Sequence, residues 1–207
     1  LKYLINFSHK NMEDFQQKLE RNIKLIYVIG SLSWIRFFIP VLAIFYIASQ
    51  VPLEQFAIIM GIYAFIILIL EIPSGVISDL IGRKKTLLFA KIAILLEIII
   101  VAFFNGFWPF LVAKIFCGIG VSLVSGTESA LMYESLKKLK RAKEYKKIFG
   151  KFHFIKNIVK AFVFILGAYL FTLNPKFPAY FSIPFILTAV ILTLFLKDVI
   201  PSKKLNI

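Results

Sequence analysis

Several charged side chains lie inside long apolar stretches of this sequence. At the centre of a membrane-spanning helix each such charge costs about 2.5–3.5 kcal/mol on insertion scales, so these residues usually pair, bind or carry charge. The residues concerned are Arg36, Glu71, Glu97, Lys114, Glu128, Lys156 and Lys160. They could bind a charged solute or a coupling ion, and they are the first candidates for a functional site.

The spacing of these residues suggests partners. His153, Lys156, Asn157 and Lys160 recur at helical intervals and share one face. Glu128 lies at a similar depth in the preceding apolar stretch, so we predict that it pairs with Lys156 or Lys160. Such a pair could serve transport or only fix the helix register, and both interpretations stay open. For Glu71 and Asp79 a structural role is favoured, and Lys91 and Lys114 are interpreted as cations that reach the membrane surface.

The motifs of enzymes and metal sites are missing from the sequence. There is no HExxH, nucleophile elbow or P-loop. Cys117 is the single cysteine, and the two histidines, His9 and His153, lie far apart. We therefore expect no enzymatic activity, no metal, no cofactor and no ATP-driven step.

The composition indicates a membrane protein. Hydrophobic residues make up 59% of the 207 residues, and the mean hydropathy is +0.84, more than a soluble domain of this size can bury. Six apolar segments are long enough to cross a bilayer, where backbone groups must be satisfied within a helix. The sequence predicts an all-α membrane protein with six transmembrane helices between residues 24 and 197, approximately at 24–48, 56–80, 86–104, 108–135, 152–173 and 178–197.

The net charge of +14 is distributed unevenly. Basic residues gather in alternate connections and near both termini, whereas the connections around 49–55, 105–107 and 174–177 contain only Lys176. This positive-inside pattern predicts that both termini are cytoplasmic, and it explains the charge without nucleic acid. The basic run 137–147 is expected to form a short surface helix facing anionic lipid headgroups, with a solvated loop as the alternative.

The two ends of the chain differ in character from the six segments. Residues 1–23 are polar with apolar residues at helical spacing, which fits a helix lying on the membrane or, preferably, one leading into the first span. Residues 198–207 are expected to begin a cytoplasmic linker. The start at Leu1 and this ending suggest a fragment, and a half-size protein that forms a homodimer is the alternative.

A motif between the second and third segments points to a family. Gly75, Asp79, Gly82, Arg83 and Lys84 resemble the G-x-x-x-D-[RK]-x-G-R-[RK] signature of the major facilitator superfamily, with Leu80 in place of the usual basic residue. Gly75 would allow close helix approach, and Gly82 a tight turn. Asp79 would pair with a basic residue or cap the next helix, while Arg83 and Lys84 stay among the headgroups. In that family the cluster acts as a latch for one of the alternating conformations.

A second resemblance lies in the fourth segment. Lys114, Gly118 and Gly120 look like the family's R-x-x-x-G-x-G pattern, with lysine in place of arginine. Residues 125–136 are similar to a sequence found in poorly characterised bacterial, drug-exporter-like members. However, residues 152–173 contain no Gly-Pro pair, which argues against a typical drug/proton antiporter.

The resemblance implies the six-helix N-terminal half of such a transporter, with a 3+3 inverted repeat and a cavity lined by its first and fourth helices. Arg36 and Glu128 are then the leading substrate or coupling-ion candidates, with Lys156 and Lys160 beside them and Tyr27, Trp34 and Ser125 as weaker ones. The expected function is secondary transport of a small solute by alternating access in a bacterial or archaeal plasma membrane, with efflux as one direction. A C-terminal half or a second copy would complete the cavity. The alternative is a non-transporting sensor or assembly partner of the same fold.

Overall fold

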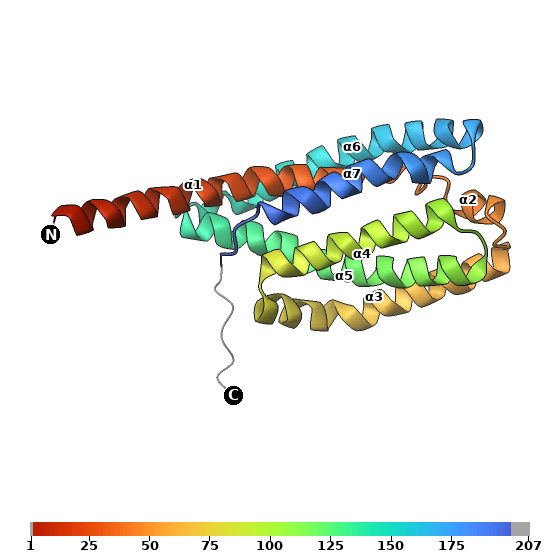
Figure 1. Ribbon diagram of the computed structural model, residues 1–207, viewed down its shortest axis with the longest axis horizontal. Coiled ribbons are helices and arrows are strands. Elements are labelled where there is room, and N and C mark those ends of the chain that lie inside the picture. Colours follow the sequence, from red (N-terminus) through yellow and green to blue (C-terminus); the bar gives the residue numbers. More distant parts are fainter. Residues whose placement is uncertain (1, 200–207) are drawn as a thin grey trace.

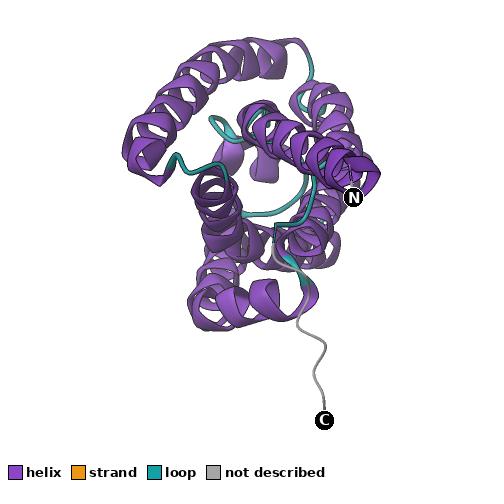
Figure 2. Cartoon of the chain, turned by 90° about the vertical axis from the view of Figure 1, so that its left-hand side faces the viewer, coloured by secondary structure: helices purple, strands orange, loops and turns teal. Residues whose placement is uncertain are grey.

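A computed structural model describes the backbone of residues 2–199, and the side chains of Glu13 and of residues 15–199. This part of the chain is helical throughout, with short connections and no strand (Figures 1 and 2). The predicted linker, residues 198–207, lies outside the described residues except for Asp198 and Val199. The helices are α1 (Lys2–Leu32), α2 (Leu42–Ala48), α3 (Leu53–Ile81), α4 (Arg83–Phe103), α5 (Phe107–Lys138), α6 (Tyr145–Leu173) and α7 (Phe177–Leu194), with a 3₁₀ turn at Ala142–Glu144.

The prediction of one helix over 24–48 is wrong. The chain leaves helical geometry between Leu32 and Leu42, a stretch that we call the broken segment, and α2 is a separate short helix. Pro40 has no N–H, and its ring would clash with the carbonyl four residues earlier, so a regular helix cannot continue through this segment. The amide of Phe37 donates instead to the Ser182 hydroxyl at 2.9 Å. A Cβ at Gly167 would overlap the carbonyl oxygen of Phe37, so only glycine lets α6 lie this close to the broken segment.

Five helical segments are long and apolar enough to cross a membrane, counted among the residues described: α3, α4, α5, residues 142–173 and α7. α1 is not one of them, and it continues through residue 23 without a break. Its residues Leu19, Ile23 and Ile26 are buried against the other helices. The expected short surface helix over 137–147 is not present, because α5 extends to Lys138 and α6 begins at Tyr145.

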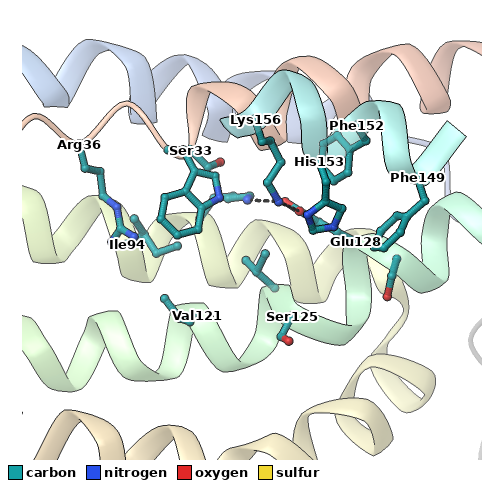
Figure 3. A pocket seen from close by; sticks show the side chains of 15 residues that line it. Ser33, Arg36, Ile94, Val121, Ser125, Glu128, Phe149, Phe152, His153 and Lys156 are labelled. Carbon is teal, nitrogen blue, oxygen red and sulfur yellow. Dashed lines mark hydrogen bonds and ion pairs between the residues drawn. The ribbon is translucent and has the colours of Figure 1, made fainter. Parts of the chain in front are cut away.

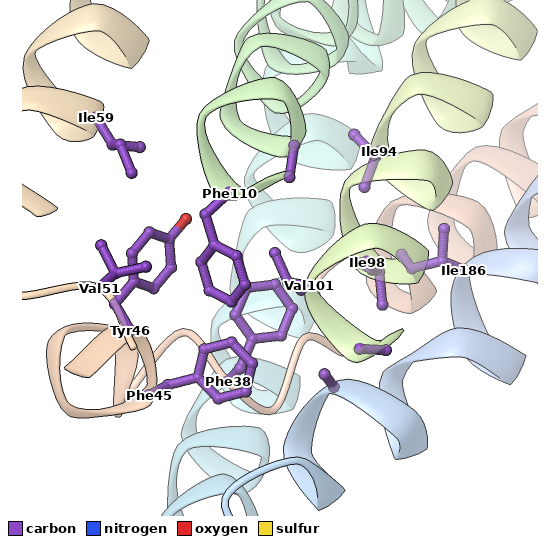
Figure 4. Close-up of a cluster of buried hydrophobic side chains, with 13 residues drawn as sticks. Phe38, Phe45, Tyr46, Val51, Ile59, Ile94, Ile98, Val101, Phe110 and Ile186 are labelled. Atoms are coloured by element: carbon purple, nitrogen blue, oxygen red, sulfur yellow. The ribbon is translucent and has the colours of Figure 1, made fainter. Parts of the chain in front are cut away.

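The helices run between two ends of the molecule (Figure 1). The turn at Gly82 and the connection 139–144 lie at the end where α7 also finishes, which we call the basic end after its Lys and Arg residues. The connections 49–52, 104–106 and 174–176 lie at the opposite end. Aromatic and branched side chains pack near that opposite end, including Phe38, Phe45, Tyr46 and Phe110 (Figure 4).

Each helix has a defined set of neighbours. α4 packs on α5 and α7, α3 packs on α5 and α4, and α1 packs on α7, α5 and α6. α3 and α6 are the most exposed of the long helices, and they turn large apolar side chains such as Phe65 and Phe162 outward. An apolar exterior of this kind suits contact with lipid.

Candidate functional site

A cavity of about 300 Å³ lies between the end of α1, the broken segment, α4, α5 and α6. Its walls combine aromatic and aliphatic groups with charged ones (Figure 3). Five of the predicted site residues line it: Trp34, Arg36, Ser125, Glu128 and, from α6, Lys156. The structure thus brings together predicted side chains from three separate segments of the chain.

Glu128 is held between two lysines. The Nζ of Lys91 on α4 donates to one carboxylate oxygen at 2.8 Å, and the Nζ of Lys156 on α6 lies 3.8 Å from the other. Figure 3 shows Lys156 extending from α6 toward Glu128. The predicted partner Lys156 is therefore present, but Lys160 is not within ion-pair distance. The interpretation of Lys91 as a snorkelling cation is wrong, because its side chain is fully buried and hydrogen-bonded to Glu128.

Glu97 forms the centre of a second network. Its two carboxylate oxygens accept hydrogen bonds from Lys114 at 2.7 Å and from Arg36 at 3.1 Å. Lys114 therefore points inward and does not snorkel, contrary to the sequence interpretation. The sequence marks Glu97 as a charge in the middle of an apolar segment, but it does not predict these partners. Arg36 also lies 3.5 Å from the Cys117 sulfur, and its Nε has no hydrogen-bond partner among the described residues.

Both networks share one arrangement. In each, a short ion pair joins α4 to α5: Lys91 with Glu128, and Glu97 with Lys114. A second cation then approaches the same carboxylate from another segment at a longer distance, Lys156 from α6 and Arg36 from the broken segment. The α4–α5 pairs form a fixed frame, which we call the charged frame, and Arg36 and Lys156 are its outer cations.

The remaining candidates take different positions. Trp34 lies beneath Lys160, whose Nζ is 3.6 Å from the centre of the indole ring. Tyr27 does not line the cavity, and its hydroxyl donates to the Ile148 carbonyl between α1 and α6. Ser125 faces a second cavity of about 230 Å³ between α3 and α5, where Glu71 also lies.

The motif at the basic end is only partly as predicted. Gly82 has a φ of +94° and forms the tight turn between α3 and α4. Asp79 pairs with Arg83 at 3.2 Å, but the carboxylate that caps α4 belongs to Asp198, which accepts from the Lys84 amide at 2.9 Å. The sequence did not indicate this role for Asp198. Arg83 is mostly buried, contrary to its predicted place among the headgroups.

The glycines of the two motifs differ in their surroundings. A Cβ built at Gly75 would meet no atom of the described residues within 4 Å beyond its own neighbouring stretch of α3, so the predicted close approach is not found there. By contrast, a Cβ at Gly120 would come within 2.8 Å of the Ala90 carbonyl, and one at Gly118 within 2.9 Å of Ile66. These two glycines allow α5 to pack closely on α4 and α3, which positions the charged frame.

Two cations outside the membrane-spanning segments have altered acidity. The hydrogen bonds that Arg141 donates to Glu144 and Glu20 raise its pKa. Burial lowers the pKa of Lys176 to about 8. The Nζ of Lys176 donates to the carbonyls of Val101 and Phe104, both at 2.8 Å, so this lysine joins the start of α7 to the end of α4.

A comparison with models of protein families gives a match over most of the chain. The family model described as Major Facilitator Superfamily matches residues 25–206, which is most of the chain. No curated protein matches the sequence.

Proposed function

Because this chain belongs to the major facilitator superfamily, whose members are membrane transporters of small solutes, we propose that it carries a small solute across the membrane by alternating access. The observation that carries this proposal is the cavity between α1, α5 and α6, which contains buried, paired charges in an otherwise apolar bundle. Charges at such depth are characteristic of substrate and ion pathways. Transport would be driven by an ion gradient. The similarity of residues 125–136 to drug-exporter-like members of the family favours export as its direction.

The helix neighbours support a six-span unit built as a 3+3 inverted repeat. In this proposal α1 with α2 forms the first span, and α3 to α7 form the other five. In such a repeat, spans one, two and three correspond to spans four, five and six, so α1 corresponds to α5, α3 to α6 and α4 to α7. The α3–α5 contact then has its counterpart in the α6–α1 contact, and the α4–α5 contact in the α7–α1 contact. Both members of each pair occur. The basic end would face the cytoplasm of a bacterial or archaeal cell, and with it both termini.

A second six-span unit would complete the transporter. α3 exposes Glu71, Gly75 and Asp79, and no ion-pair partner of Glu71 is found among the described residues. Carboxylates within membrane-spanning helices almost always face protein or a water-filled cavity. We therefore propose that this face of α3 contacts a C-terminal half or a second copy of the chain.

The charged frame suggests how the conformations interchange. The short α4–α5 pairs would stay intact, while the outer cations Arg36 and Lys156 leave and rejoin their carboxylates as α1 and α6 move. The longer distances of the outer cations, 3.1 and 3.8 Å against 2.7 and 2.8 Å, support this division. The two carboxylates and Arg36 are the residues that would couple solute binding to movement.

Uptake into sealed vesicles tests the proposal. The protein, with any chain it has beyond residue 207, is reconstituted into liposomes, a pH gradient is imposed in each direction, and solutes from a cell extract are identified inside by mass spectrometry. We expect a solute that accumulates with the parent protein, is lost when an ionophore collapses the gradient, and is lost with Glu128→Gln. The exposed Glu144→Gln variant is the matched control. If no solute accumulates with correctly folded protein, a sensor or assembly role replaces transport.

A further inference from the structure

Positive charge exceeds negative charge around the main cavity. Arg36, Lys91, Lys114 and Lys156 surround only two carboxylates, those of Glu97 and Glu128. All six residues are less than a tenth exposed. No third carboxylate lies within ion-pair distance of these cations in the part of the chain that the structure describes. Four cations against two carboxylates leave an excess of two positive charges.

The excess is located on the cavity side. The two frame pairs neutralise Lys91 and Lys114, so the unbalanced charges are the outer cations Arg36 and Lys156, and both line the cavity. The Lys156 ammonium lies 3.8 Å from Glu128, which is beyond hydrogen-bonding distance, and the Arg36 Nε has no acceptor. Burying an uncompensated cation in an apolar interior is expensive, so these donors favour an anion that would pair with them.

We propose that the cavity binds a small organic anion whose carboxylate or phosphate group engages Arg36 and Lys156. This inference rests on the proposed function, since it names the class of solute that the same cavity would carry. Arginine suits planar, bidentate recognition of such groups. The nearby rings of Trp34, Phe149 and Phe152 offer an apolar wall for the organic part of the ligand. A cationic solute would instead meet an excess of like charge.

Trp34 allows the charge of the cavity to be measured directly. The chain has two tryptophans, Trp34 in the cavity wall and the exposed Trp108. In a Trp108→Phe protein in neutral detergent, quenching of Trp34 fluorescence is compared for iodide, caesium and uncharged acrylamide. The quenching constants of iodide and of caesium are each divided by that of acrylamide. We expect the iodide ratio to exceed the caesium ratio about threefold or more, because the local potential concentrates anions. Equal quenching, or stronger quenching by caesium, would overturn the proposal.

Two substitutions should move this ratio in opposite directions. Lys156→Gln removes an outer cation and should reduce the advantage of iodide, whereas Glu128→Gln removes a carboxylate and should increase it. Lys151→Gln, at an exposed position on the same helix, is the matched control and should leave the ratio unchanged. Unchanged acrylamide quenching shows that each variant is folded. An iodide advantage that survives Lys156→Gln undiminished contradicts the role of this lysine.

Benzoate, benzylammonium and benzyl alcohol share one ring and differ in charge, so they test the class of solute. Benzoate should protect Trp34 from acrylamide at the lowest concentration. No preference for benzoate, or protection by phosphatidylglycerol where benzoate has no effect, overturns the assignment to a small organic anion. These measurements need no transport. If the cavity prefers anions but vesicles take up no solute, only the proposed function is contradicted. If vesicles take up a solute but the cavity prefers benzylammonium, only this inference is contradicted.

Discussion

At the residue scale, Glu97 is a buried carboxylate held by two cations. It is fully buried, and it accepts hydrogen bonds from Lys114 on α5 and from Arg36 in the broken segment. Removing the carboxylate leaves two buried cations without a counter-charge, which costs far more than the net contribution of a well-made pair.

Glu97→Gln is therefore expected to destabilise the protein by about 3–5 kcal/mol, the range for breaking a buried pair. Thermal unfolding in detergent, followed by circular dichroism, measures the effect. The double variant Glu97→Gln with Lys114→Gln should recover part of the loss, because one unpaired cation is removed. Glu144→Gln, in an exposed ion pair, should change the stability little. A loss no larger for Glu97→Gln than for Glu144→Gln would contradict the network.

The sequence located the buried charges, but of their partners it predicted only Lys156 for Glu128. Arg36, Glu97, Lys114 and Glu128 stand out because charge is rare in apolar segments. Which of them meet depends on which helices are neighbours and on how far each lysine reaches. Lys91 was misread for this reason, since depth from the nearest end of a segment does not show whether a side chain points outward or inward.

At the element scale, the break between α1 and α2 depends on a glycine in another helix. A side chain at Gly167 would overlap the Phe37 carbonyl, and backbone atoms cannot rotate away as a side chain can. Gly126 of α5 also lies within a helix, but a Cβ there would meet no atom within 4 Å. Substituting alanine at both glycines therefore separates two effects. Both substitutions change the helix propensity, but only the one at Gly167 adds a packing cost.

Gly167→Ala should destabilise the protein by about 1–3 kcal/mol through overpacking, whereas Gly126→Ala should stabilise it by up to about 1 kcal/mol through helix propensity. Thermal unfolding of both variants alongside the parent checks the signs. Equal, stabilising effects at both positions would show that α6 does not lie against the broken segment.

Most helices were predictable from apolar runs alone. The predicted segments 86–104, 108–135 and 178–197 agree with α4, α5 and α7 to within a few residues. The first segment was not, because residues 37–48 are as apolar as a continuous helix would be, and only Pro40 signals the break. The Ser182 hydroxyl and Gly167, which accommodate the broken segment, lie more than a hundred residues away in the sequence.

At the scale of the whole molecule, the end opposite the basic end is held together through backbone groups. Lys176 joins the end of α4 to the start of α7, and the Gly106 amide donates to the Ser49 carbonyl at 2.9 Å. Lys176 was visible in the sequence as the single basic residue on that side. Its partners are carbonyl groups, which a sequence pattern does not reveal.

The acidity of Lys176 predicts a pH dependence. Burial lowers its pKa from 10.5 to about 8, so between these values the unfolded chain binds more protons than the folded one. Stability relative to a Lys176→Gln variant should therefore rise as the pH increases through 8 to about 10, and level off about one pH unit below 8. The neutral amine keeps two N–H groups, enough for both carbonyls.

Unfolding temperatures of the parent and of Lys176→Gln, measured side by side at pH 7.5 and pH 10, test this sign. Using the difference between the two proteins removes the contribution of the other lysines. If the parent loses stability relative to the variant on going to pH 10, the charged form is the one that the fold favours.

The charged frame also has a consequence for biosynthesis. Glu97 and Lys91 lie on α4, and Lys114 and Glu128 on α5, so each helix would carry two charges into the bilayer if it entered alone. Entering together as a hairpin, with the short connection at residues 104–106 leading, the two helices can neutralise each other's charges before they meet lipid. If the helices insert in this way, α4 waits in the insertion machinery until α5 has been made, and we expect a nascent chain that ends shortly after residue 103 to remain there.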